Sequence, residues 1–216
     1  MVFSNKYFFR CVCLGLLVSF LDVPQDVAAD GVMNIVMEDQ FQTTCETSVF
    51  LGDVVILVYA ERHGAEKSLQ LGRKLHLHFH PTADTVSSDA WSQQPVRGIM
   101  NWPSGVPVPD VRVIPVASLT EVPRALKPVA RARIRKDSPL VPLWLDFEGS
   151  LERMFGIIPG EPNIVVLDTA GQVHSVFSGK LDDQEFQQFV TRVDQIRSAS
   201  LNNVRIVTGT NEKVLR

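Results

Sequence analysis

The chain has 216 residues, of which 45% are hydrophobic and 21% charged, a composition typical of a globular protein with a packed core. Its formal net charge of -3 gives no global field that would attract nucleic acid or an anionic membrane. We therefore expect one folded domain and exclude nucleic acid as a partner.

The first 29 residues predict a secretory signal peptide. Lys6 and Arg10 form a basic start, and residues 11–21 form an apolar run that is too short to span a bilayer comfortably. The small residues at 27–29 favour cleavage after Ala29. The sequence thus predicts an exported protein, periplasmic or secreted, without stable membrane insertion after cleavage. An uncleaved membrane anchor is the alternative.

Cleavage would leave a single cysteine, Cys45. The other two, Cys11 and Cys13, lie in the predicted signal peptide. One cysteine cannot form an intramolecular disulfide, so the core alone has to stabilise the exported domain.

Residues 30–50 come next and predict a small β-hairpin. Val32–Met37 alternates loosely between apolar and polar residues, and Thr43–Thr47 is rich in β-formers. The polar residues 38–40 between them are suited to a turn.

A strand followed by a helix is predicted at the centre of the fold. The apolar run Asp53–Ala60 is typical of a buried strand, and a helical pattern covers Gly64–His78. A strand that leads into a helix places free backbone N–H groups and the positive end of the helix dipole at the edge of a sheet. The residues at this break are His63, Gly64, Ala65 and Glu66.

Residues 80–110 predict an inserted Pro-rich loop. A long helix is excluded by Pro81, Pro95, Pro103, Pro107 and Pro109, together with Gly98 and Gly105. Two tryptophans, Trp91 and Trp102, indicate that the loop packs on other parts of the protein. Because long loops without regular structure are often functional, we expect this insertion to cover part of a site.

Thr120–Lys136 predicts a basic helical segment with six arginines and lysines. It is either a solvated helix face or a site for an anionic partner.

The remaining elements complete an α/β pattern. Strands are predicted at 111–117, 140–145, 163–168 and 172–177, and helices at 147–155 and from residue 182. Pro115 predicts a bent or partly unpaired strand, and Val204–Val207 an extra edge strand or a poorly ordered end. The order predicts a three-layer α/β/α sandwich with a mixed sheet. We expect a signal peptide at 1–29, one domain at 30–199 and a C-terminal tail at 200–216.

Three segments resemble the thioredoxin-like superfamily, in particular its peroxiredoxin and periplasmic thiol-oxidoreductase branch. Residues 52–60, G-D-V-V-I-L-V-Y-A, resemble the family's first core strand, G-K-V-V-L-V-N-F-W-A. Residues 145–151, L-D-F-E-G-S-L, resemble its D-x-x-G-x-L segment, and residues 161–173 resemble its P-T-x-x-x-I-D-x-x-G-x-I hairpin. The resemblance covers 33–197 apart from the insertion and implies a thioredoxin-like fold.

The sequence departs from the family at the catalytic position. Family members carry Cys-x-x-Cys or a peroxidatic cysteine there, whereas this chain has His63 in the first cysteine position and Glu66 in the second. The family's thiolate chemistry therefore has no nucleophile at its usual place. The resemblance also implies a cis peptide bond between Glu161 and Pro162, facing His63. The ligand-binding residues that we predict are His63, Gly64, Glu66 and Pro162.

Two other sites are kept as alternatives. Cys45 is either a reactive thiol or a small buried side chain. His76, His78 and His80 form a histidine cluster, in which His76 and His80 have the i, i+4 spacing of helical zinc sites. A histidine-rich helix end that suits the helix dipole is the other interpretation.

We therefore predict a binding or interaction module without catalysis. Its partner is an unknown protein or small molecule, no cofactor is expected, and the oligomeric state is left open. The alternatives are a thiol-dependent peroxidase or reductase that uses Cys45, and a metal-binding protein that uses the histidine cluster.

Overall fold

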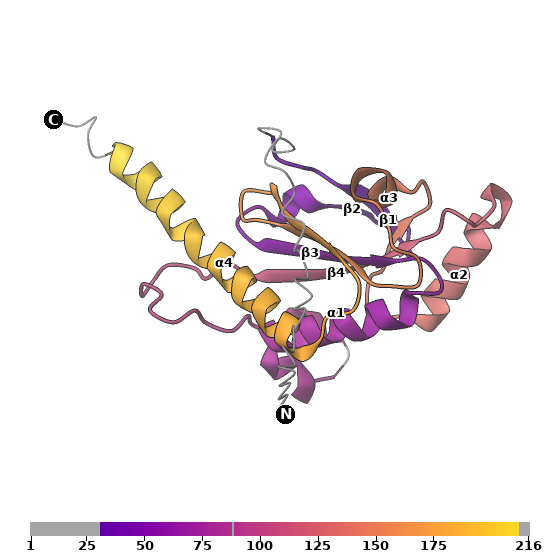
Figure 1. The fold of residues 1–216 in the computed structure, drawn as a ribbon, viewed down its shortest axis with the longest axis horizontal. Coiled ribbons are helices and arrows are strands. Elements are labelled where there is room, and N and C mark those ends of the chain that lie inside the picture. Colours follow the sequence, from indigo (N-terminus) through magenta and orange to yellow (C-terminus); the bar gives the residue numbers. More distant parts are fainter. Residues whose placement is uncertain (1–30, 88, 212–216) are drawn as a thin grey trace, which may run out of the picture.

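A computed structural model describes residues 31–87 and 89–211, with side chains up to residue 201. The predicted signal peptide lies outside the described residues. The fold is built on a seven-stranded mixed sheet with the strand order β2-β1-β5-β4-β3-β6-β7 (Figure 1). The described part of the chain contains no helix that is long and apolar enough to cross a membrane.

Three parallel strands form the centre of the sheet: β3 (Val54–Ala60), β4 (Val111–Ser118) and β5 (Trp144–Asp146). Every residue of β3 is buried, as its continuous apolar run predicts. The ladder between β4 and β5 begins at Val116, so Pro115 lies where β4 pairs only with β3. A proline is tolerated there because its missing N–H removes no hydrogen bond towards β5.

Two antiparallel hairpins complete the sheet. The predicted lead-in hairpin is confirmed as β1 (Val36–Asp39) and β2 (Thr44–Glu46), but its turn lies at residues 40–43 and not at the predicted 38–40. β1 also pairs with β5. The second hairpin is β6 (Asn163–Leu167) and β7 (Val173–Ser178), with β6 antiparallel to β3.

The turn of the second hairpin is fixed by two residues. Gly171 adopts a φ of 75°, which glycine reaches without a steric cost. The Asp168 carboxylate accepts hydrogen bonds from the backbone N–H groups of Ala170 and Gln172, each at 2.9 Å. An aspartate that caps its own turn is a common local pattern, which explains why the sequence predicts this hairpin well.

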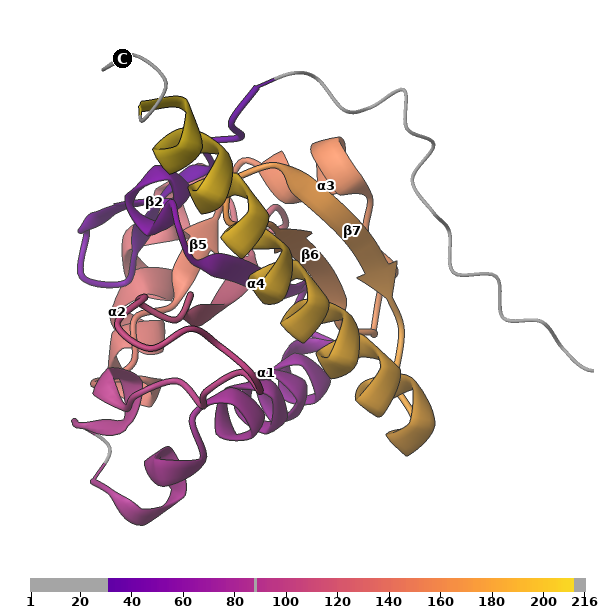
Figure 2. The same ribbon diagram turned by 90° about the vertical axis from the view of Figure 1, so that its left-hand side faces the viewer.

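Helices cover the two faces of the sheet unequally. α1 (Ala65–Phe79) and α4 (Asp183–Asn211) pack on one face, where Leu75 and Val193 belong to one buried cluster with the strand residues (Figures 1 and 2). On the other face α3 (Ser150–Phe155) contributes the buried Leu151 to a second cluster. The predicted three-layer α/β/α sandwich is confirmed.

The order of elements matches the thioredoxin-like arrangement implied by the sequence. A β3-α1-β4 unit is followed, after an α2-β5-α3 segment, by the β6-β7 hairpin and α4. The hairpin adds to the sheet beside β3, on the side opposite β4. The fold is therefore thioredoxin-like.

The C-terminal helix is longer than the sequence predicts. It begins with a reciprocal cap, in which the Asp182 N–H donates to the Glu185 carboxylate and the Glu185 N–H donates to the Asp182 carboxylate, both at 2.8 Å. The helix then continues without a break to Asn211, and its last turns extend past the sheet (Figure 1). The predicted edge strand at Val204–Val207 is wrong, because these residues continue the helical hydrogen bonding instead of pairing with the sheet.

The insertion 80–110 contains two short 3₁₀ segments, η3 (Pro81–Thr85) and η4 (Trp91–Gln93). It starts where α1 ends, at the amino ends of β3 and β4. A 15-residue helix spans about 22 Å, so α1 carries the chain that far from the strand-to-helix break. Our expectation that the insertion covers the site at His63 is therefore wrong.

The predicted basic segment forms η5 (Arg124–Leu126) and α2 (Lys127–Asp137), and none of the residues of α2 is buried. Ion pairs hold it to the body: Lys127 contacts Glu148 and Arg131 contacts Glu38. Half or more of its basic charge thus faces partners within the protein, which favours the solvated-face interpretation.

Candidate functional site

The strand-to-helix break presents His63 on the surface with a fixed orientation. Its side chain is 79% exposed, and its Nδ1 lies 3.0 Å from the Glu61 carboxylate, which also accepts the His63 backbone N–H. The second carboxylate oxygen of Glu61 accepts the backbone N–H of Gly160. Because Glu61 holds Nδ1, the ring presents Nε2 to solvent.

Glu61 is held as an anion by these contacts. Slight desolvation opposes ionisation, but the hydrogen bonds from the backbone N–H groups of His63 and Gly160 and from the His63 ring keep the pKa of Glu61 below its ordinary value. The charge fixes two loops that are about a hundred residues apart in the chain, the one after β3 and the one before β6.

Gly64 brings the start of α1 into direct contact with the loop before β6. A Cβ atom at this position would lie 2.9 Å from the Glu161 carbonyl oxygen and 3.0 Å from the Ala60 Cβ. Both distances are shorter than normal contacts, so only glycine fits without a shift of the backbone. Gly64 and Pro162, two of the predicted ligand-binding residues, thus lie near each other, because Gly64 contacts the backbone of Glu161 next to Pro162.

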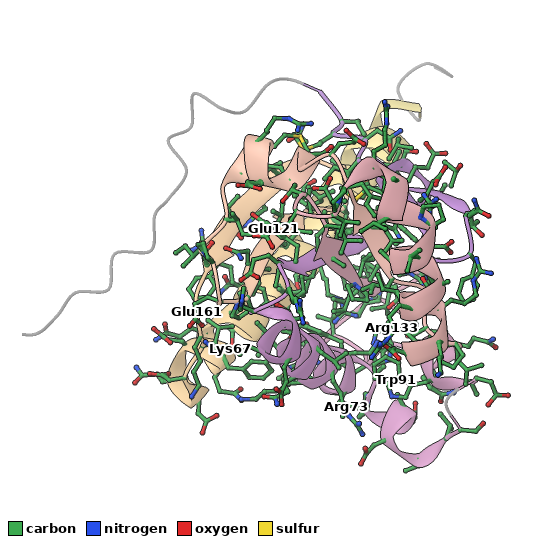
Figure 3. All side chains as sticks on the ribbon, turned by 90° about the vertical axis from the view of Figure 1, so that its right-hand side faces the viewer. Lys67, Arg73, Trp91, Glu121, Arg133 and Glu161 are labelled. Atoms are coloured by element: carbon green, nitrogen blue, oxygen red, sulfur yellow. The ribbon has the colours of Figure 1, made fainter. Side chains whose placement is uncertain are left out.

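Lys67 strengthens the same contact from the first turn of α1. Its Nζ forms an ion pair with the Glu161 carboxylate and donates to the Gly160 carbonyl oxygen at 2.8 Å. Figure 3 shows Lys67 beside Glu161 on one side of α1 and Trp91 on the other side. The rim of the candidate site is therefore a salt-bridged edge between α1 and the loop that leads into β6.

Pro162 is buried, and the Glu161–Pro162 peptide bond is trans, so the predicted cis bond is wrong. That prediction came from the resemblance alone, whereas an ordinary X–Pro bond favours trans by roughly 0.5–1 kcal/mol. The loop is held by the buried Asn163. Its side chain accepts from the Ile158 N–H at 2.9 Å and donates to the Glu161 carbonyl oxygen at 3.0 Å.

Glu66 lies one turn into α1 and is exposed. Its carboxylate accepts a weak hydrogen bond from Gln70 at 3.3 Å and is otherwise directed to solvent. A carboxylate in the first turn is favoured by the helix dipole, by about 0.3–1 kcal/mol at an exposed position.

The strand-to-helix break carries no thiol. The described residues at the break offer an imidazole, carboxylates and an ammonium group. These groups donate and accept hydrogen bonds and carry charge of both signs, which suits recognition of a polar partner. Sequence analysis missed Glu61, Lys67 and Glu161. A carboxylate two residues before His63 was a usable signal for Glu61, but the partners of Lys67 lie more than 90 residues away.

Cys45 is far from this site. It belongs to the edge strand β2, which lies four strand spacings from β3, about 19 Å across the sheet. Its thiol contacts the Thr43 carbonyl oxygen at 3.5 Å. Partial burial, and to a lesser extent the Asp39 carboxylate, raises the pKa of the Cys45 thiol. Both effects lower the thiolate fraction at neutral pH, and His63 is too distant to activate the thiol.

The three clustered histidines do not converge on one point. His76 and His80 stack with ring centroids 4.4 Å apart and are buried, whereas His78 points towards Phe186 of α4 at 5.7 Å. Within residues 31–87 and 89–211, no group of three or more His, Cys, Asp or Glu side chains is arranged to hold a metal ion. The nitrogens of His76 and His80 instead contact oxygens of the protein.

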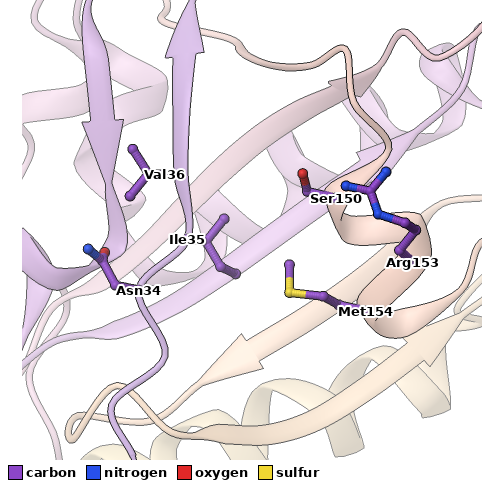
Figure 4. Close-up of a pocket in the computed structure, with 6 residues that line it drawn as sticks. All are labelled: Asn34, Ile35, Val36, Ser150, Arg153 and Met154. Atoms are coloured by element: carbon purple, nitrogen blue, oxygen red, sulfur yellow. The ribbon is translucent and has the colours of Figure 1, made fainter.

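Two shallow pockets lie elsewhere on the described surface. One of about 280 Å³ lies between the lead-in to β1 and α3, where Asn34 and Val36 face Ser150, Arg153 and Met154 (Figure 4). The other, of about 490 Å³, lies between the β6-β7 hairpin and α4. Neither includes His63 or Glu66, whose side chains are exposed.

No protein-family model matches this sequence, and no curated protein matches it. Solved structures do match. The lipoprotein thioredoxin Etrx1 of Streptococcus pneumoniae is 15% identical, with a TM-score of 0.47 over 74% of this chain and 99% of that one. A secreted thiol-disulfide isomerase of Corynebacterium glutamicum is also 15% identical, with a TM-score of 0.45 over 76% of this chain and 85% of that one.

A peroxidoxin, BcpB of Mycobacterium tuberculosis, is 20% identical with a TM-score of 0.40, over 78% of this chain and 94% of that one. At such identities and TM-scores, these proteins do not assign an activity to this chain. The class of the fold follows from its own strand order and helix placement.

Proposed function

We propose that this chain is an exported thioredoxin-like binding module that recognises a protein or small-molecule partner without redox catalysis. The observation that carries the proposal is that His63, and not a thiol, stands at the exposed strand-to-helix break, where α1 directly contacts the loop before β6. Export is part of the proposal and is supported by the basic, then apolar, sequence of residues 1–29.

The polar groups of the surface are fixed before a partner arrives. Glu61 orients the His63 ring, Lys67 is held by Glu161, and Gly64 locks the backbone. A surface that is already ordered loses less conformational entropy on binding. Exposed His63 and Glu66 are then available to donate and accept hydrogen bonds at the partner.

A peptide-display experiment tests this surface. The wild-type protein and the double variant His63→Ala/Glu66→Ala are immobilised and panned against a phage library of random peptides. We expect peptides that the wild type enriches and that the double variant binds at least about tenfold more weakly. A matched control is Arg73→Ala, an exposed change further along α1. If the double variant bound the enriched peptides as strongly as the Arg73→Ala control does, the binding site would lie elsewhere on the protein.

A redox assay separates this proposal from a thiol enzyme. We expect the protein not to accelerate insulin reduction by dithiothreitol, and Cys45→Ser not to change that result. Reductase or peroxidase turnover that Cys45→Ser abolishes would contradict the proposal and support the thiol alternative.

A further inference from the structure

A stack of three aromatic rings, two of them buried, joins the carboxyl end of α1 to the insertion. The His76 ring lies between Trp91, at a centroid distance of 3.7 Å, and His80, at 4.4 Å. His76 is only 6% exposed and His80 only 3%. The Nε2 of His76 lies 3.1 Å from the Trp91 carbonyl oxygen, so both the ring and the backbone of η4 contact this one side chain.

Charged groups surround the stack on the sides that the sheet and α4 provide. The Asp110 carboxylate, just before β4, contacts His80 Nε2 at 2.8 Å and Arg112 at 3.0 Å. From α4, the Arg197 guanidinium lies over the Phe79 ring, as does that of Arg97 from the insertion.

We infer that the His76–Trp91 contact is an acid-sensitive latch, and that protonation of His76 releases η4 from α1. A neutral imidazole has one N–H donor and one acceptor nitrogen. Since Nε2 donates to the Trp91 carbonyl oxygen, an added proton must go to Nδ1 inside the stack. The resulting cation is buried beside a second histidine, and moving η4 away lets water reach it.

The direction of the pH effect follows from this burial. Desolvation, reinforced by His80, outweighs the opposing effects of the Trp91 carbonyl oxygen and the Asp110 carboxylate and lowers the pKa of His76 to about 4. The released ring has the ordinary value of about 6.5. The released state therefore binds a proton that the latched state excludes, so the latch is at full strength above about pH 6.5 and weakens as the pH falls towards 4.

The rest of the insertion is held by contacts that do not involve His76. The buried Arg197 donates to the carbonyl oxygens of Pro109 at 2.8 Å and Arg97 at 2.9 Å, and its Nη1 lies 2.9 Å from the Asp194 carboxylate. The Arg97 N–H donates to the Phe79 carbonyl oxygen at 2.7 Å. Acid thus loosens η4 locally and leaves the second half of the insertion in place.

Hydrogen exchange at pH 7.5 and pH 4.5 tests the latch on the purified wild-type protein. After correction for the intrinsic pH dependence of exchange, we expect the η4 amide of Gln93, whose N–H donates to the Ala90 carbonyl oxygen at 3.2 Å, to exchange at least about tenfold faster at pH 4.5. The amides of β6 report the global fold and are expected to stay protected. Equal protection of η4 at both pH values would overturn the inference.

Two variants assign the effect to His76. His76→Phe keeps an aromatic ring in the stack but cannot titrate, so its η4 amides are expected to exchange equally at both pH values. His78→Phe is the matched control, since His78 lies on the same helix but faces α4, and it is expected to keep the acid response. An acid response that persists in His76→Phe would overturn the latch.

A third measurement does not depend on the folding of His76→Phe. In Trp91→Ala, which removes one side of the stack, the His76 ring followed by NMR is expected to titrate at least one pH unit higher than in the wild type. An unchanged His76 titration would show that Trp91 does not control it.

Discussion

The two ends of α1 use polar residues in opposite ways. At the amino end, His63 is 79% exposed and the contact with the neighbouring loop is made by the backbone of Gly64. At the carboxyl end, His76 and His80 are almost fully buried, and their ring nitrogens contact protein oxygens.

This difference shows that the role of a histidine depends on its burial and its hydrogen-bond partners, and that the presence of histidines does not by itself locate a site. The carboxyl end has more histidines and the zinc-like spacing, but there the side chains connect the insertion to the helix. The amino end has one histidine, oriented by Glu61 and open to a partner. The candidate binding surface is therefore at the end with fewer histidines.

The largest effect is expected from removing the buried Arg197 beside the carboxyl end. Arg197→Met keeps the aliphatic stem but leaves the Pro109 and Arg97 carbonyl oxygens without this donor. Loss of one partner from a buried charged network typically costs 3–5 kcal/mol, so we expect the free energy of unfolding in urea to fall by about 3 kcal/mol. Arg73→Met, an exposed control on α1, should change it by less than about 0.5 kcal/mol. A cost of Arg197→Met similar to that of the control would show that this network does not stabilise the fold.

A smaller loss is expected when the wild-type protein is acidified. The lowered pKa of His76 means that the unfolded chain takes up a proton between about pH 6.5 and pH 4 that the folded chain excludes, so stability falls with pH in this window. A pKa shift of this size limits the loss in the free energy of unfolding to about 3 kcal/mol. Because release of η4 lets the folded protein take up the proton, we expect an observed loss of about 2 kcal/mol. Urea unfolding curves at pH 7 and pH 4.5 measure it. His76→Phe should reduce the pH dependence without abolishing it, because burial also lowers the pKa of His78 and His174, whereas an unchanged slope would assign it to other groups.

Two glycines of α1 give a matched comparison between a crowded and an open position. Gly64→Ala places a Cβ 2.9 Å from the Glu161 carbonyl oxygen and should lower the free energy of unfolding by about 1–2 kcal/mol. Gly72→Ala places a Cβ in open space within the same helix and should raise it by about 0.5–1 kcal/mol. Thermal or urea unfolding of both variants checks that the two changes in the free energy of unfolding have opposite signs. If both variants gained stability, the close approach of α1 to the loop before β6 would be disproved.

Much of the fold could be predicted because its signals are local. The continuous apolar run of β3 identifies a buried strand, and Asp168 with Gly171 identifies the β6-β7 turn. The tail prediction failed because the three β-branched residues within Val204–Val207 outweighed the helical pattern that precedes them. Local propensity alone does not decide such a segment.

The parts that could not be predicted depend on contacts between distant residues. Arg197 reaches Pro109 across 88 residues of chain, and Lys67 reaches Glu161 across 94. Neither pair has a spacing signature, so the sequence did not reveal which end of α1 the insertion covers. His63 and Gly64 were identified by their place after β3, but how Glu61 and Glu161 complete the site required the three-dimensional arrangement.

The smallest stability effect and the most selective binding effect are expected at the amino end. His63→Ala and Glu66→Ala remove exposed side chains, so each should change the free energy of unfolding by less than about 0.5 kcal/mol. Peptides selected on the wild type should nevertheless bind each variant several-fold more weakly, measured by titration calorimetry. His76→Phe, at the other end of the helix, should bind the same peptides as well as the wild type does at pH 7.5. If His63→Ala cost more than about 1 kcal/mol of stability, its imidazole would be a structural group like His76, and the contrast between the two ends of α1 would fail.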